Sequence, residues 1–403
     1  MPPIMGRMRL TGKGRRWIQG GHPWVYRDDI ADGDGTAGEL VPVEAPSGEV
    51  LGWGLYSTAS RIAVRLVTRR PEQPRRDFWN AVVERALAAR TAAGLMNPEG
   101  ACRLLSGDAD GVPGLVVDRY GTALVLQSGC QGSDRMRDFI LELLEEQLPF
   151  EITTLVDRSD TGVRKHEELE ARTEILRGSA QKPVLVQEEA LLYEVNLLAG
   201  HKTGHYLDQR FNRQRAAHGA QGERVLDAFC YDGLFGIRAA LAGAESVLCL
   251  DQSAEAEARL MRNAELNGVA ERVSFEKVNA MTDLRRRAQA VCAGEEASYG
   301  LVVLDPPAFA RSRREVRGAE RGYVELNRRG MELLGEGGEL VSASCSHAIR
   351  PEDFLEFIGA GARGAGCEVF LKEFTGAGPD HPARLLLPES RYLKCAFLRV
   401  AAV

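Results

Sequence analysis

The sequence contains no long hydrophobic run. No segment approaches the ~18 consecutive apolar residues that a membrane-spanning helix needs, and the basic N-terminal segment MPPIMGRMRLTGKGRRW has no apolar stretch behind it. This is not the pattern of a secretory signal. We therefore expect a cytoplasmic protein that does not contact a membrane.

Cysteine is sparse and unpaired in the sequence. The eight cysteines are scattered, with no CxxC motif, and the chain has no HxH motif either. This spacing argues against a disulfide framework and against a bound metal, and it predicts a reducing compartment. Because free cysteine is usually a small core residue, we expect Cys230, Cys249, Cys292 and Cys395 to be buried.

Lysine is rare, and positive charge is in deficit. The chain has 7 lysines against 44 arginines and a formal net charge of −6, which counts mildly against a nucleic-acid partner. The distribution softens this objection, because residues 1–27 carry six Arg or Lys and no Asp or Glu. Arg15 and Arg16 lie in this arm, and arginine offers a planar fork suited to phosphate.

The length of 403 residues predicts several domains, since single cores rarely exceed roughly 250–300 residues. Residues 1–72 read as short strands with glycine-rich turns, which predicts a small β-barrel. After the linker TRRPEQPRRD, residues 77–183 combine an Ala-rich helical pattern with a strand pair around DGVPG, typical of an α+β domain. Residues 184–403 form a third, more regular domain.

This third segment alternates apolar strands with helical stretches. Strands that are apolar throughout predict a doubly wound α/β sheet covered on both faces. Ligands of such sheets bind beyond the carboxyl ends of the strands, near the topological switch point. The expected strands are 224–230, 246–251, 273–279, 300–305, 339–346, 368–374 and 392–400.

Polar residues end three successive strands of this sheet. The first strand runs into DAFCYDGLFG, which carries Asp227 and Gly233; the second ends at Asp251 and the third at Asn279. A glycine turn lets backbone approach a ligand, a carboxylate can accept both hydroxyls of a ribose, and an amide can read an adenine edge. Helix capping is the alternative for each position, but together they favour a nucleoside-containing cofactor.

The fourth strand ends in DPPAF. Its two prolines fix the backbone after Asp305, and Phe309 could face a flat substrate ring. Asp-Pro-Pro is also a good turn. A rigid carboxylate at this strand end nevertheless favours function.

The fifth strand ends in SCS, at Cys345. Because the fourth and fifth strands of a doubly wound sheet are neighbours, we expect Cys345 and Asp305 to emerge side by side at one edge. A thiol at a strand end among polar residues could ionise and act as a nucleophile. His347 is a candidate to lower the pKa of this thiol, and an ordinary surface histidine is the equal alternative.

The order DAFCYDG, LDQS, VNAM, DPPAF, SCS resembles the motifs of class I S-adenosylmethionine-dependent methyltransferases. The likeness covers the whole chain: GHPWVY and GLYS are similar to an RNA-binding PUA domain, and DGVPGLVVDRYG and KTGHYLDQR resemble the bacterial 23S ribosomal RNA large-subunit methyltransferase I family. The resemblance implies a PUA-like β-barrel, a central α+β domain and a seven-stranded Rossmann-like methyltransferase sheet.

The resemblance also implies roles for individual residues. The loop after the first strand would hold the methionine end of S-adenosylmethionine, the end of the second strand its ribose, and the end of the third its adenine. Residues of KTGHYLDQR would close over the cofactor. The implied cofactor-binding residues are Tyr206, Gln209, Arg210, Asp227, Phe229, Cys230, Tyr231, Gly233, Asp251, Gln252, Asn279, Ala280 and Asp305.

The implied reaction is methylation of cytidine at carbon 5. Cys345 would be the nucleophile that adds to carbon 6, and Asp305 would hydrogen-bond the target base. No metal is required. Two alternatives remain: methylation of an exocyclic amine, for which Cys345 would be inert, and a non-catalytic ribosome-assembly protein with a degenerate cofactor pocket.

The implied partner is 23S ribosomal RNA before full subunit assembly, because the target base must be unpaired or flipped out. RNA contacts are expected from the N-terminal arm and barrel and from cations near the active edge. A homodimer is also compatible with the sequence. The expected RNA-binding residues are Arg15, Arg16, Lys202, Arg311, Arg313 and Arg314.

Overall fold

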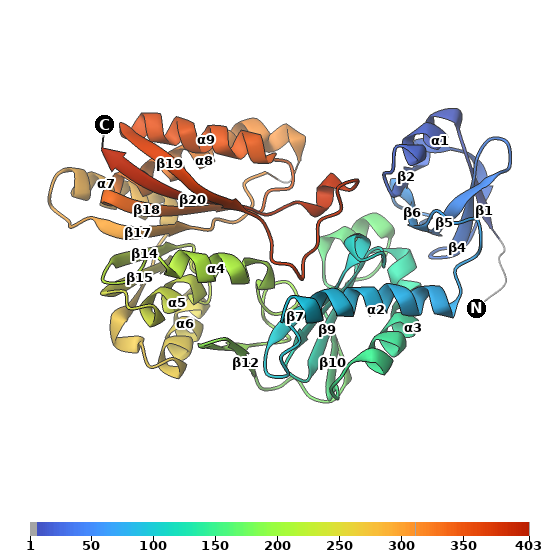
Figure 1. The fold of residues 1–403 in the computed structure, drawn as a ribbon, viewed down its shortest axis with the longest axis horizontal. Helices are drawn as coiled ribbons and strands as arrows, with labels where there is room; N and C mark the ends of the chain where they lie inside the picture. Colours follow the sequence, from blue (N-terminus) through green and yellow to red (C-terminus); the bar gives the residue numbers. More distant parts are fainter. Residues whose placement is uncertain (1–5, 311, 403) are drawn as a thin grey trace. The chain divides into compact units, whose positions relative to one another are not determined.

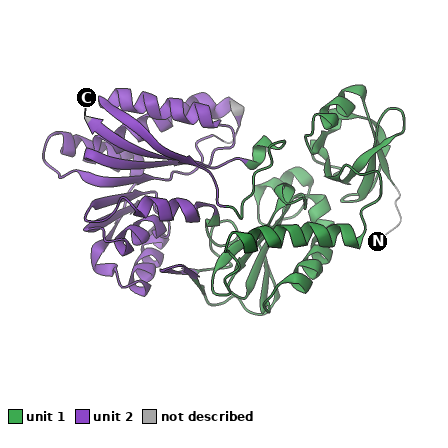
Figure 2. Cartoon of the chain, in the orientation of Figure 1, with its two compact units in different colours: residues 1–186, 195–207, 379–390 green, residues 187–194, 208–378, 391–403 purple. Residues whose placement is uncertain are grey.

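A computed structural model describes residues 6–310 and 312–402, with the backbone alone at 313 and 402. The chain forms two compact units, each built from separate segments (Figures 1 and 2). Within the described residues, no helix has both the length and the apolar character needed to cross a bilayer. The first unit comprises residues 1–186, 195–207 and 379–390; the second comprises 187–194, 208–378 and 391–403.

The first unit begins with a six-stranded, mostly antiparallel sheet in the order β2-β6-β5-β4-β1-β3. Alternating apolar residues of its strands meet the short helix α1 in a closed core that includes Val25, Val43 and Ile18. The elements are β1 (Arg7–Leu10), α1 (Gly12–Gln19), β2 (Trp24–Tyr26), η1 (Arg27–Asp29), β3 (Ile30–Asp34), β4 (Leu40–Glu44), β5 (Val50–Tyr56) and β6 (Ile62–Thr68).

The same unit contains a five-stranded sheet in the order β11-β10-β9-β8-β7. The expected strand pair around DGVPG is present, because β7 and β8 pair antiparallel. The elements are α2 (Arg76–Ala92), β7 (Ala101–Ser106), η2 (Gly107–Ala109), β8 (Leu115–Tyr120), β9 (Ala123–Ser128), α3 (Gln131–Gln147), β10 (Thr154–Asp157), η3 (Gly162–Glu167) and β11 (Glu174–Arg177). The segment 379–390 also belongs to this unit and carries η7 (Pro388–Ser390).

A short hairpin precedes the second large sheet. Strands β12 (Val184–Glu188) and β13 (Leu191–Val195) form a two-stranded sheet of their own. They are followed by η4 (Leu207–Gln209) and α4 (Arg210–Ala217), which contain the end of the KTGHYLDQR motif.

The second unit is built on a seven-stranded sheet in the order β16-β15-β14-β17-β18-β20-β19. This confirms the predicted α/β class. One feature differs from the expected parallel pattern: β20 runs antiparallel to both β18 and β19. The strands are β14 (Arg224–Ala228), β15 (Ser246–Asp251), β16 (Val273–Lys277), β17 (Tyr299–Leu304), β18 (Leu334–Ser344), β19 (Cys367–Thr375) and β20 (Lys394–Ala402).

Helices cover both faces of this sheet (Figure 1). Helix α8 packs against α7 and α9 on one side, and α5 packs against α4 and α6 on the other. The α7–α9 side encloses a core that includes Leu304, Leu340 and Phe354. The elements are α5 (Leu234–Leu241), α6 (Ala254–Leu266), η5 (Ala270–Arg272), α7 (Ala280–Cys292), η6 (Arg313–Glu315), α8 (Val316–Glu332) and α9 (Pro351–Ala365).

Local sequence explains where these helices start and stop. Helix α9 begins with Pro351, whose fixed φ suits the first helical position, and ends before Gly366 at φ 66°.

Cys230, Cys249 and Cys395 are buried as expected, but Cys292 is exposed. The expectation for Cys292 was wrong because this residue is the last of α7 and faces solvent where the helix ends.

Candidate active site

The loop that follows β14 has an unusual backbone. Phe229, Tyr231 and Gly233 have φ values of 64°, 51° and 75°, in the left-handed region. Side chains other than glycine occupy this region at a cost of about 1–3 kcal/mol, and such residues cluster at ligand sites. The Gly233 N–H donates to Cys230 O over 2.8 Å, which closes the loop onto the start of α5. The loop is thus a tight, fixed cradle at the end of β14, the first strand of the seven-stranded sheet in chain order.

Asp227 is buried beneath this loop. Its Oδ2 accepts a hydrogen bond of 2.9 Å from the Gly236 N–H, while its buried Oδ1 has no partner among the residues that the structure describes. Burial raises the pKa of Asp227 to about 7, and the charges of Asp305 and Asp251 act in the same direction. A buried acceptor without a partner is unusual and fits a polar or cationic ligand.

Asp251 is the last residue of β15 and is half-buried. Its Oδ2 accepts from the Tyr231 N–H at 3.1 Å and its Oδ1 from the Ser253 N–H at 2.9 Å. Each oxygen keeps a further lone pair, so the carboxylate can still accept hydroxyl groups. Gln252, beside it, is exposed. The carboxylate therefore fixes the cradle and remains available to a ligand.

Asn279 has the structural role that was its alternative interpretation. It is the N-cap of α7, and its Oδ1 accepts from the Thr282 N–H at 3.2 Å. The amide is exposed, whereas Ala280, the first residue of the helix, is buried. The Thr282 hydroxyl also donates to this oxygen, at 3.4 Å, so capping leaves the amide nitrogen as the group that can contact a ligand.

These polar residues gather at the switch point of the sheet. Strand β14 lies between β15 and β17, where the strand order reverses, and the crevice beyond the carboxyl ends is the usual ligand position in such folds. Asp227, Asp251 and Asp305 belong to these three adjacent strands or follow them directly. Their mutual repulsion favours a cationic ligand.

Asp305 is held by the end of the KTGHYLDQR motif. Gln209 is buried, and its Nε2 donates to Asp305 Oδ1 at 3.0 Å. Asn212 Nδ2 in turn donates to Gln209 Oε1 at 2.6 Å, which fixes the orientation of the amide. Gln209 therefore connects helix α4 with the end of β17.

Two other residues of the motif lie elsewhere. Arg210 is buried in an ion cluster, where its Nε lies 3.2 Å from Glu188 Oε2 and Arg213 Nη2 lies 2.9 Å from the same atom. Burial opposes ionisation of Glu188, but the neighbouring guanidinium groups hold its pKa below its usual value. Tyr206 belongs to the first unit, where its hydroxyl lies 3.0 Å from His201 Nδ1. Cofactor contact by Arg210 and Tyr206 stays a prediction.

Cys345 follows β18 directly and is half-buried. Strands β17 and β18 are parallel neighbours, with Leu304 opposite Ser342. Cys345 and Asp305 consequently leave the sheet at the same edge, as the sequence predicted. The thiol is thus neither sealed in the core nor distant from the switch point.

The turn that carries Cys345 is tied to its surroundings through Ser346. The Ser346 Oγ lies 3.1 Å from the Tyr323 hydroxyl on α8 and accepts from the Ala310 N–H at 3.3 Å. The ring centroids of Phe309 and Tyr323 lie 4.7 Å apart, so Phe309 packs on helix α8; contact of Phe309 with a substrate stays a prediction. The DPPAF and SCS segments are therefore held together by one buried serine and one tyrosine.

Sequence reasoning missed Lys394. This first residue of β20 pairs with Ser344, and its Nζ donates to Ser346 O at 2.7 Å and Tyr392 O at 2.8 Å. Burial lowers the pKa of Lys394 to about 8, although the charge of Cys345 raises it. The sequence does show a single lysine inside the apolar run YLKCAFLRV. Its position beside the Cys345 turn depends on the antiparallel register of β18 and β20, which the sequence does not reveal.

The expected RNA-binding residues are distributed over both units. Arg16 is exposed and Arg15 half-buried on α1, Lys202 is exposed, and Arg314 is exposed near the start of α8. Arg311 and the side chain of Arg313 lie outside the described residues. Lys202 Nζ lies 4.5 Å from the Tyr206 ring centroid, a cation–π contact.

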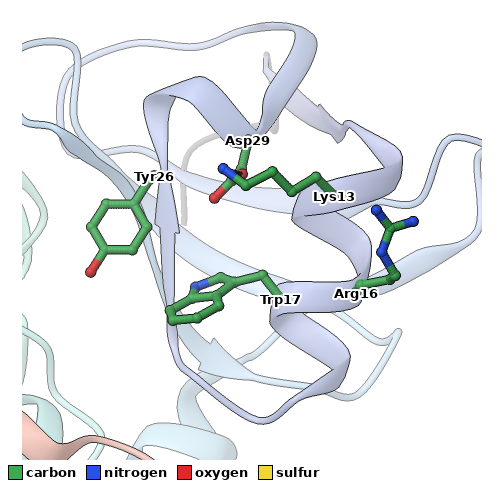
Figure 3. Close-up of a pocket in the computed structure, with 5 residues that line it drawn as sticks. All are labelled: Lys13, Arg16, Trp17, Tyr26 and Asp29. Carbon is green, nitrogen blue, oxygen red and sulfur yellow. Dashed lines mark ion pairs between the residues drawn. The ribbon is translucent and has the colours of Figure 1, made fainter.

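Helix α1 borders a hollow of about 480 Å³ on the first sheet (Figure 3). Lys13 extends to Asp29, with 3.2 Å between Nζ and Oδ1, near the rings of Trp17 and Tyr26. Trp17 is 42% exposed although its indole N–H donates to Trp24 O. Cations beside exposed aromatic rings suit a ligand with phosphates and flat bases.

The fold and the strand-end residues define a class of enzyme. Residues 160–383 match the family model of the S-adenosylmethionine-dependent methyltransferases, and residues 8–69 match that of a PUA-like domain. A methyltransferase solved with SAH superposes with a TM-score of 0.83 at 20% identity, over 98% of this chain and 100% of that one. A SAM-dependent methyltransferase from Streptococcus mutans gives 0.80 at 19% identity, over the same shares.

Curated relatives identify the family within this class. Ribosomal RNA large subunit methyltransferase I of Shewanella amazonensis is 35% identical over 98% of this chain and 99% of its own length. The same-named protein of Aeromonas hydrophila is 35% identical over 94% and 95%. The chain belongs to the ribosomal RNA large subunit methyltransferase I family of S-adenosylmethionine-dependent methyltransferases.

The residues present fit the cofactor of this family, S-adenosylmethionine. Its sulfonium and amino groups are cationic, and the switch point presents three carboxylates, one with a buried oxygen that lacks a partner within the described ranges 6–310 and 312–402. The left-handed loop 229–233 brings backbone close to the site, and Asp251 can accept the ribose hydroxyls. Among the described residues, no cluster suits a metal ion.

Proposed function

We propose that the chain methylates carbon 5 of a cytidine in 23S ribosomal RNA through a covalent bond to Cys345. The observation that carries the proposal is the half-buried thiol at the end of β18, at the same sheet edge as Asp305. The names of the curated relatives support ribosomal RNA of the large subunit as the substrate. The cytosine chemistry rests on the thiol.

Carbon 5 of cytosine is a poor nucleophile, and a thiol solves this problem. The Cys345 thiolate adds to carbon 6, which gives the ring enamine character and makes carbon 5 nucleophilic. Asp305, oriented by Gln209, hydrogen-bonds the base. S-adenosylmethionine supplies an electrophilic methyl group on a sulfonium. Once carbon 5 is methylated, a base removes its proton and the thiolate is expelled from carbon 6.

We assign cofactor binding to the loop 229–233 and to the carboxylates of Asp227 and Asp251. The contacts of Asp251 with the Tyr231 and Ser253 amides support this role, because they orient the carboxylate. RNA would be bound by the basic, aromatic face of α1, in the cytoplasm and before the large subunit is fully assembled. An unassembled RNA leaves the target base accessible.

The decisive experiment uses RNA that contains 5-fluorocytidine. The fluorine cannot be removed as a proton, so the enzyme should remain covalently attached and run with the RNA on a denaturing gel. Cys345→Ala should abolish both the adduct and methyl transfer while S-adenosylmethionine still binds. Cys367→Ala, which removes another half-buried thiol of the same unit, should keep the adduct.

Two results would decide for other functions. DPPAF-type segments also serve enzymes that methylate exocyclic amines, and methyl transfer at a normal rate by Cys345→Ala would favour that reaction. Absence of S-adenosylmethionine binding in calorimetry would favour a non-catalytic assembly role.

Asp251→Ala should weaken cofactor binding, in contrast to Cys345→Ala. Nucleoside mapping of ribosomal RNA from a deletion strain would identify the modified base.

A further inference from the structure

Lys394 is a lysine in an unusual environment. Its side chain is 1% exposed, and its ammonium group donates to two backbone carbonyls, of Ser346 and Tyr392. Within the described part of the chain, no carboxylate pairs with it. A buried ammonium without a counter-ion is strongly disfavoured. The position therefore calls for a nearby anion.

The candidate for this anion is Cys345. Lys394 lies opposite Ser344 in the β18–β20 ladder and bonds the carbonyl of Ser346, so it contacts the backbone on both sides of the cysteine. The thiolate charge of Cys345 acts on Lys394 and favours its protonated form. The same attraction stabilises the thiolate.

The neighbouring helix α8 contributes a tyrosine to the surroundings of the Cys345–Ser346 turn. Among the described residues of this helix, no cation competes with Lys394 for the thiolate. Tyr323, on α8, keeps its proton at neutral pH because burial raises its pKa. Tyr392, just before β20, donates its hydroxyl to Asp208 Oδ2 at 2.6 Å, and its ring lies tilted against that of His347 with 5.2 Å between ring centroids. The titratable groups around Cys345 are Lys394 from β20, Tyr323 from α8, Asp305 after β17, and His347 and Tyr392 in the adjoining loops.

We propose that Lys394 is a positioning residue for Cys345: its buried ammonium fixes the Cys345–Ser346 turn and keeps the thiol ionised for attack. The inference rests on the nucleophilic role of Cys345 proposed above. At neutral pH the ammonium is mostly protonated, since its pKa is about 8. The thiol and the ammonium then titrate as a coupled pair.

The test measures the thiol directly, without RNA or cofactor. The full-length protein is treated with iodoacetamide over a range of pH, and the alkylation rate of the Cys345 peptide is followed by mass spectrometry. In Lys394→Met, which keeps the length of the side chain but removes its charge, the midpoint should rise by about one pH unit or more. The rate near neutral pH would then fall about tenfold. Lys394→Arg, which keeps the charge, should retain the low midpoint.

The alkylation of Cys367 in the same samples is the internal control and should not change. A profile of Cys345 that is identical in the wild-type protein and in folded Lys394→Met would overturn the proposal. If Lys394→Met does not fold, the wild-type protein decides. The thiolate absorbance that is lost in Cys345→Ser should titrate below the ordinary thiol pKa of about 8.5; a midpoint at or above that value rejects the inference.

Failure of this inference is distinguishable from failure of the proposed function. If 5-fluorocytidine RNA still forms the adduct but the alkylation profile is independent of Lys394, cytosine chemistry stands and the positioning role is wrong. If the profile depends on Lys394 but no adduct forms, the ion pair stands and the reaction is a different one.

Discussion

At the scale of single residues, the site is dominated by like charges brought close together. Three adjacent strand ends supply Asp227, Asp251 and Asp305. Burial raises the pKa of Asp227 to about 7, and the charges of the other two carboxylates act in the same direction. The sequence predicted these three residues, because each stands where an apolar strand stops. It did not predict the protonation, which depends on burial and distance.

A cationic cofactor should change the charge of Asp227. The sulfonium favours the carboxylate, so binding lowers its pKa and releases up to about half a proton per site near pH 7. Affinity should accordingly rise as pH increases from about 5 to 7 and level off above. Calorimetric titration with S-adenosylmethionine in two buffers of different ionisation enthalpy measures the release.

Asp227→Asn is the matched variant, since it keeps the acceptor for the Gly236 amide and cannot titrate. Its binding heat should be the same in both buffers. A buffer-independent heat in the wild-type protein at pH 7 would show that Asp227 does not face the cofactor.

At the scale of elements, the strands were predictable and the register was not. Apolar runs predicted all seven strands of the large sheet, and neighbouring positions of β17 and β18 followed from the doubly wound pattern. The antiparallel direction of β20, between β18 and β19, was not predicted, because an apolar run shows that a strand is present and not which way it runs. For this reason the contact between Lys394 and the Cys345 turn was not foreseen, nor was the bond between Gln209 and Asp305.

The loop between β14 and α5 should be sensitive to a single methyl group. Gly233 has φ 75°, and a Cβ there would come within 2.6 Å of Leu260 Cδ1 and Cγ. Gly233→Ala should lower the free energy of unfolding by about 1–3 kcal/mol and weaken S-adenosylmethionine binding. Urea unfolding and calorimetry measure the two effects.

Gly268→Ala is the control that measures the cost of placing alanine in the left-handed backbone region without a steric clash. Gly268 has φ 65°, but a methyl group added there would meet no atom within 4 Å. The substitution should cost less stability than Gly233→Ala and leave cofactor binding unchanged. Equal losses in the two variants would mean that the packing against Leu260 is unimportant.

At the scale of the whole molecule, charge is unevenly distributed. The net charge is −6, yet residues 1–27 are basic and the exposed cation Arg16 lies on α1 next to the hollow with Trp17. This segregation was visible in the sequence. The grouping of Lys13, Trp17, Tyr26 and Asp29 around one hollow required the fold of the first sheet.

Arg16→Ala should weaken binding of ribosomal RNA several-fold and reduce the slope of log K against log salt concentration by about one. Filter binding over a salt series measures the slope. Arg76→Ala removes an exposed arginine that is already paired with Glu142 and Glu146 and should leave RNA binding intact. Identical slopes for wild-type protein and Arg16→Ala would exclude α1 from the interface.

The chain passes back and forth between its two units, at 186/187, 194/195, 207/208, 378/379 and 390/391. The sequence suggested consecutive blocks, and the division into three domains stays a prediction, because a linear order of motifs cannot reveal a chain that returns. The segment 379–390 belongs to the first unit, and Lys394 follows only a few residues later.

This interleaving limits how such a protein can be taken apart. A single cut by a protease between residues 187 and 390 leaves each unit with pieces on both sides of the break, so the fragments should stay associated. For the same reason, a gene-shuffling event with one crossover cannot exchange one unit for another. The two units must therefore be exchanged together.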